Sequence, residues 1–152
     1  LDIKHLSMSQ SLSKIWVHAI FATKNRAPFI RSEIKPQVYT FIRQQLQALG
    51  CGDCCINGMP DHVHVLFLSN PQKNLSEIIK QVKSRSSYFI NTQQLLTEKF
   101  AWQAGYAAYS VSQSQSETVY QYIANQERHH ELLSFHDEYE AFRALYHVRQ
   151  TA

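Results

Sequence analysis

The chain of 152 residues is the size of one domain, and its 44% hydrophobic residues are enough to bury an ordinary core. No apolar run is long enough to span a bilayer, and the first residues lack the apolar centre of a signal peptide. The formal net charge of +3 is compatible with nucleic acid but does not require it. We therefore expect one domain over residues 8–150, preceded by a cloning remnant or disordered N-terminus over residues 1–7.

The three cysteines, Cys51, Cys54 and Cys55, form an odd and tightly clustered set. Such a set argues against a disulfide framework and indicates a reducing compartment, so we expect a cytoplasmic protein. Without a second pair at similar spacing, the cluster does not predict a zinc knuckle, and small buried strand residues are the simpler interpretation.

In chain order, a β-branched and aromatic run, IWVHAIFA, predicts a first strand over residues 15–22. A helix is expected over residues 33–49, where apolar residues recur at helical spacing and Gly50 follows the end. A strand over residues 51–56, a turn at Asn57-Gly58 and a strand over residues 62–68 are expected next.

The second half of the chain predicts a helix that begins at Asn74 or Ser76 and ends near Ile90. A strand over residues 105–111, a helix over residues 117–129 and a last helix over residues 137–146 follow, with Ser114 or Ser116 as the cap of the third helix. This order is that of a ferredoxin-like α+β sandwich, a split βαβ arrangement with an antiparallel sheet and extra C-terminal helices. Its first and third strands form the central pair.

The run PDHVHVLFLS places two histidines at alternate positions of the third strand. His62, His64 and Leu66 share one face, while Val63 and Val65 share the other. Neutral imidazole nitrogens on one face can converge on a cation. Taken alone, this pattern is equally compatible with two ordinary histidines on a polar sheet face.

On the helix near the C-terminus, Tyr122 and Gln126 lie one turn apart and share a face. A phenol is a poor nucleophile at neutral pH, but a nearby cation can lower its pKa or polarise the phosphate that it attacks. The amide oxygen of Gln126 can complete a ligand set with the histidines. The alternative is a packed tyrosine and a solvated glutamine. His129 and His130 point about 100° apart on a helix, so they cannot easily share one metal. We interpret them as surface residues, or as a modest favourable contact with the helix C-terminus.

Basic residues occur in two places where nucleic acid could bind. Lys24 and Arg26 lie in a loop, and Lys80, Lys83 and Arg85 lie on a helix among serines. A solvated helix face is the alternative interpretation of the second group.

Together these motifs resemble the single-tyrosine HUH transposases of the insertion-sequence 200/605 group. The resemblance spans residues 12–145 and rests on WVHAIFATKNRAPF, GMPDHVHVLFL, IIKQVKSRSS, AWQAGYAAYSVSQS, ETVYQYIANQERHH and LLSFHDEYEAF. It implies that His62, His64 and Gln126 bind Mg²⁺ or Mn²⁺ and that Tyr122 is the nucleophile. Tyr120 is the nearest competitor, but it lacks the four-residue spacing to Gln126.

The resemblance also implies an activity. A transposase of this kind cuts and rejoins single-stranded DNA at hairpin-marked element ends through a 5′-phosphotyrosine link. It acts as a homodimer with composite sites, in which the tyrosine helix comes from the other subunit.

Tyr106 and Tyr109 fall in the fourth strand region and are expected to be structural.

Three other readings remain open at this point. A domesticated relative that processes dispersed genomic hairpins would use the same residues. A non-catalytic ferredoxin-like module that binds RNA or DNA would need aromatics on the sheet face, where this chain has histidines. A histidine-triad nucleotide hydrolase would need a third alternating histidine, but Leu66 occupies that position.

Overall fold

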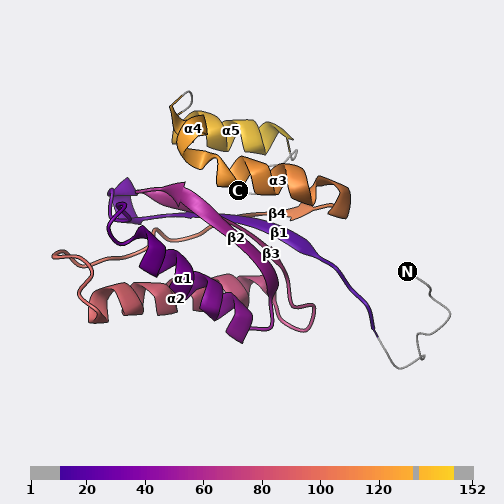
Figure 1. The fold of residues 1–152 in the computed structure, drawn as a ribbon, viewed down its shortest axis with the longest axis horizontal. Coiled ribbons are helices and arrows are strands. Elements are labelled where there is room, and N and C mark those ends of the chain that lie inside the picture. Colours follow the sequence, from indigo (N-terminus) through magenta and orange to yellow (C-terminus); the bar gives the residue numbers. More distant parts are fainter. Residues whose placement is uncertain (1–10, 132–133, 146–152) are drawn as a thin grey trace.

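The computed structural model describes residues 11–131 and 134–145. Its centre is a four-stranded antiparallel sheet in the order β2-β3-β1-β4, so β1 and β3 are the central pair as expected (Figure 1). The strands are β1 (Trp16–Ala22), β2 (Gly52–Met59), β3 (His62–Leu68) and β4 (Ala107–Val111).

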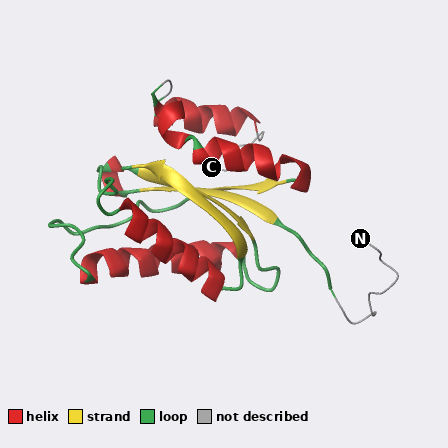
Figure 2. Ribbon diagram, viewed as in Figure 1, coloured by secondary structure: helices red, strands yellow, loops and turns green. Residues whose placement is uncertain are grey.

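Helices cover both faces of the sheet (Figures 1 and 2). Two long helices cover one face, and three shorter helices from the C-terminal part cover the other. The first group is α1 (Lys35–Ala48) and α2 (Leu75–Thr92); the second is α3 (Ser116–Ala124), α4 (Gln126–His130) and α5 (Phe135–Leu145). The ferredoxin-like α+β sandwich with extra C-terminal helices is thereby confirmed. Within the described residues, none of these helices is both long and apolar enough to cross a membrane.

The side chains of β3 point alternately to the two faces of the sheet, so one set joins the main core and the other faces the candidate site. Val63, Val65 and Phe67 are buried in the main hydrophobic cluster, which α1 and α2 complete. Leu66 instead packs with Ile123 of α3 in a smaller cluster on the opposite face. Because side chains of a strand alternate, His62 and His64 share the face of Leu66, as the sequence predicts. The C-terminal helices cover this face (Figure 1).

The turn expected at Asn57-Gly58 is wrong, because both residues lie inside β2 and the chain reverses at Pro60 and Asp61. Gly58 is instead a position where the backbones of β2 and β3 approach closely. A Cβ on Gly58 would come within 2.2 Å of the His62 carbonyl oxygen, so the position requires a residue without a side chain.

The continuous helix expected over residues 117–129 is also interrupted. Helix α3 ends at Ala124, and Asn125, with φ −104° and ψ 25°, separates it from α4. The residue before the first turn of α3 is Gln115, so neither predicted serine is the N-cap, although the Ser116 hydroxyl donates to the Gln113 carbonyl. After this break, α4 packs against β2.

Candidate metal centre and tyrosine site

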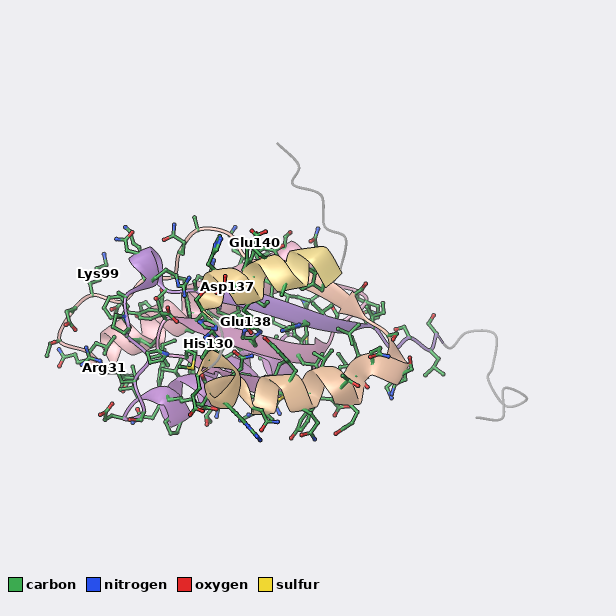
Figure 3. The ribbon with its side chains drawn as sticks, turned by 90° about the horizontal axis from the view of Figure 1, so that it is seen from above. Arg31, Lys99, His130, Asp137, Glu138 and Glu140 are labelled. Carbon is green, nitrogen blue, oxygen red and sulfur yellow. The ribbon has the colours of Figure 1, made fainter. Side chains whose placement is uncertain are left out.

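Two fully buried histidines of β3 face a carboxylate from α5. The distance from His64 Nε2 to Glu138 Oε1 is 3.3 Å, and His62 Nε2 lies 3.8 Å from Glu138 Oε2. One ligand atom from each of the three residues lies within 4.8 Å of the others, which makes the group able to hold a metal ion. In the view from above, Glu138 is labelled between the ribbons of α4 and α5 (Figure 3).

Sequence reasoning missed Glu138. Its only sequence signal was the stretch LLSFHDEYEAF, which belongs to the resemblance without carrying an assigned role. Although burial alone would raise it, hydrogen bonding and the charge of His64 lower the pKa of Glu138 below its ordinary value. The carboxylate is therefore ionised at neutral pH, the form that binds a cation.

Gln126 approaches the same carboxylate from the start of α4. Its Nε2 donates a hydrogen bond to Glu138 Oε1 at 3.1 Å, and the whole residue is buried. Its other atom, Oε1, is also buried and accepts no hydrogen bond from the described part of the chain. An uncompensated buried oxygen is costly, and a cation would satisfy it. Two imidazoles, a carboxylate and an amide oxygen could together bind a divalent cation.

His130 also belongs to this site, so its interpretation as a surface residue is wrong. Its Nε2 lies 2.6 Å from Glu138 Oε2, and its ring centroid is 4.8 Å from that of His62. His130 is the last residue of α4, which begins directly after the break at Asn125. Figure 3 shows His130 next to Glu138.

Tyr122 contacts the same cluster from α3. Its ring centroid lies 5.9 Å from that of His64, and its hydroxyl donates to Glu138. Burial, with the hydrogen bond to Glu138 and the charge of that carboxylate, raises the pKa of Tyr122 above its ordinary value. Tyr120 is 46% exposed and is not part of the cluster.

A second layer of side chains orients the two histidines. His62 Nδ1 lies 2.7 Å from Asp61 Oδ1, and His64 Nδ1 lies 2.9 Å from Nε2 of the buried His18. Both contacts engage Nδ1 and direct Nε2 toward Glu138. Sequence reasoning missed His18 and Asp61, because only the pairing of β1 with β3 and the turn before β3 bring them to these rings.

The predicted DNA-binding residues divide into two groups. Three of them form hydrogen bonds with other groups of the chain. Arg26 donates to Asp61 at 2.6 Å, Lys83 donates to backbone carbonyls, and Arg85 donates to Gln45. Lys24 and Lys80 are exposed. Arg26 thereby supports the Asp61 carboxylate that contacts His62.

The two tyrosines expected to be structural also differ from one another. Tyr109 is buried in β4, as expected. Tyr106 precedes β4 and is 41% exposed, so it lies outside the strand and is only partly buried.

The fold and the buried site define an α+β protein with a tyrosine beside a candidate divalent-metal centre. A family profile described as "Transposase IS200 like" matches residues 11–126, most of the chain. The chain therefore belongs to the IS200-like transposase family. Transposases cleave and rejoin DNA, which assigns the protein to that class of enzyme.

Individual relatives agree with this assignment. The ISDra2 transposase TnpA of Deinococcus radiodurans is 25% identical over 114 residues, covering 72% of this chain and 81% of the relative. A crystal structure of a protein assigned as a transposase from D. radiodurans R1 has a TM-score of 0.63 at 25% identity, covering 80% of this chain and 97% of the other.

A second solved structure, a REP-associated tyrosine transposase bound to a REP hairpin, shares the fold at 13% identity. Its TM-score is 0.56, and the match covers 84% of this chain and 76% of the other.

Proposed function

We propose that this transposase cleaves and rejoins single-stranded DNA through a 5′-phosphotyrosine on Tyr122, at a Mg²⁺ or Mn²⁺ centre held by His62, His64, Gln126 and Glu138. The observation that carries the proposal is the shared carboxylate. Glu138 contacts both histidines and the glutamine and also accepts the hydrogen bond of the Tyr122 hydroxyl. The nucleophile and the ligand set therefore form one site.

The side chains suggest how the phenol is used. Tyr122 is held protonated at neutral pH, because burial and the adjacent Glu138 carboxylate raise its pKa. When bound, a divalent cation would offset that charge and polarise the scissile phosphate. The Tyr122 oxygen then bonds to phosphorus while the bond to the 3′ oxygen breaks, and the 3′ oxygen takes up a proton and leaves as a 3′-hydroxyl. Glu138 is the nearest acceptor for the phenolic proton.

Rejoining is the reverse reaction. A 3′-hydroxyl attacks the phosphotyrosine, the new phosphodiester forms, and the Tyr122 oxygen leaves and regains its proton. The covalent link conserves the energy of the cut bond, so no nucleotide cofactor is needed. Hairpin-marked DNA as the substrate is supported by the solved relative that is described with a bound REP hairpin.

Homodimerisation stays a prediction of the resemblance. Within the single chain, Tyr122 already lies beside the histidines, which supports catalysis by a tyrosine and a metal centre of one molecule. Mixing His64→Ala protein with Tyr122→Phe protein tests this. Cleavage restored by the mixture would show that sites are composite, and the absence of cleavage supports a site within one chain.

The main test uses single strands from the DNA that flanks the reading frame, labelled at the 3′ end. With Mn²⁺, the wild-type protein should form a labelled covalent adduct that survives denaturing electrophoresis, and a chelator should abolish it. Tyr122→Phe should form none, whereas Tyr120→Phe, altered on the same helix outside the cluster, should react normally. An adduct on Tyr122→Phe would contradict the proposal. Tight binding without cleavage under any metal would favour a non-catalytic binding module.

A further inference from the structure

The segment 103–106, within the sequence motif AWQAGY, forms a wall shared by two hollows. One hollow of about 450 Å³ lies between this segment and α2. The other, of about 250 Å³, lies between the segment, β1 and α5. Because β4 is an edge strand and the segment leads directly into it, the adjoining hollows pass around that edge of the sheet.

The smaller hollow lies beside the metal centre. Ile20 and Ala22 of β1 line it, and their register partners on β3 are His64 and His62. Tyr139, which directly follows Glu138 on α5, lines it too. The larger hollow leads away from this centre to the opposite face of the sheet. There α2 lines it with two lysines and three serines: Ser76, Lys80, Lys83, Ser84 and Ser87.

The lining suits a nucleic-acid strand. Among the described residues, no Asp or Glu lines either hollow. Tyr106 lines both hollows and is 41% exposed, and Tyr139 is 38% exposed. Lysine and serine side chains contact phosphates, and exposed tyrosine rings stack on unpaired bases. The combination fits a single strand better than a duplex, whose bases are already stacked on one another.

The wall is held in place, which makes Tyr106 a fixed platform. Gly105 has φ +83°, a backbone conformation that favours glycine. The Lys83 ammonium donates to the carbonyls of Gln103 and Gly105 at 2.7 and 2.5 Å, and the Gln103 N–H donates to Ala22 at 2.8 Å. Lys83 is thus engaged with the loop, and the exposed Lys80 is the cation available to a phosphate.

We propose that these two hollows form a path for the single-stranded DNA next to the cut phosphate, in which Tyr106 stacks on a base and Lys80 contacts a phosphate. The inference rests on the proposed function, which supplies single-stranded DNA as the substrate. It gives a role to the Gly-Tyr of the AWQAGY motif, which the chemistry of the metal centre does not use.

The test measures binding of a labelled single-stranded deoxyoligonucleotide of mixed sequence by fluorescence anisotropy, with Tyr122→Phe as the parent to prevent cleavage. Adding Tyr106→Ala should weaken binding roughly fivefold to a hundredfold, as expected for one lost stacking contact. Tyr106→Phe should restore it, because the ring is kept. Adding Lys80→Ala should reduce the slope of log affinity against log salt by about 0.7, whereas Tyr106→Ala should leave that slope unchanged.

Tyr88→Ala is the matched control. Tyr88 is 72% exposed on α2 but lines neither hollow, so its loss should leave binding at the level of the parent. If the parent binds the oligonucleotide and both Tyr106→Ala and Lys80→Ala bind equally well, the path is wrong and the proposed function stands. If the parent binds no single-stranded DNA, the proposed function fails and the path with it.

Discussion

At the scale of single residues, the site depends on how each histidine presents its ring. Both Nδ1 atoms are engaged, by Asp61 and by His18, so both Nε2 atoms point toward Glu138. Burial, with the nearby His64, lowers the pKa of His18 to about 3, so its ring is neutral at neutral pH. A neutral His18 can accept a hydrogen bond from His64 Nδ1–H, which fixes the tautomer that binds a metal through Nε2.

Replacing His18 therefore tests the metal centre without changing a ligand. His18→Phe keeps a ring of similar shape in the buried position but removes the acceptor for His64. We expect Mn²⁺ affinity, measured by titration calorimetry, to fall about 10- to 100-fold, the usual effect of losing such a support. His136→Ala, an exposed histidine of α5, is the control and should bind Mn²⁺ normally. Equal affinity in His18→Phe and the wild type would contradict this role.

At the scale of elements, the β2–β3 hairpin positions the histidines through a close backbone approach. Gly58→Ala would bring a Cβ within 2.2 Å of the His62 carbonyl oxygen, so the strands must separate. We expect the free energy of unfolding to fall by about 1–3 kcal/mol, the usual range for overpacking. In Gly52→Ala, on the same strand, the new Cβ would lie 3.8 Å from the nearest atoms, which belong to the Leu68 side chain. This variant should change the free energy of unfolding by less than about 0.5 kcal/mol. Denaturant titration compares both, and equal stability of the two variants would refute the argument.

The elements also show how far the sequence alone can predict. Alternation along β3 and helical spacing in α1 and α2 are local signals, and they predicted those elements closely. The turn predicted at Asn57-Gly58 was wrong because glycine is favoured both in turns and where two backbones approach closely. Only the pairing of β2 with β3 distinguishes these two cases. Glu138, His130 and His18 join the site through contacts between elements distant in the chain, which no local pattern encodes.

At the scale of the whole molecule, the sheet separates a stabilising face from a functional face. The main core lies between the sheet and α1 and α2, whereas α3, α4 and α5 meet the opposite face at a small apolar cluster and a buried polar site. His62 and His64 belong to the sheet, but Gln126 and Glu138 belong to the C-terminal helices. A cation bound by all four would join the helices to the sheet and stabilise the folded state of the whole chain.

Because the bound cation would stabilise the folded state, we expect Mn²⁺ to raise the unfolding temperature. With free Mn²⁺ at about 100 times its dissociation constant, the folded state should gain about 2.7 kcal/mol, provided that the unfolded chain does not bind the ion. For a chain of this size the gain raises the unfolding temperature by roughly 5–11 °C in calorimetry. His62→Ala combined with Glu138→Ala should lose the shift, and His136→Ala should keep it. A full shift in the double variant would place the cation elsewhere in the chain, for example at the cysteines around Cys54, and would disconnect metal binding from the tyrosine site.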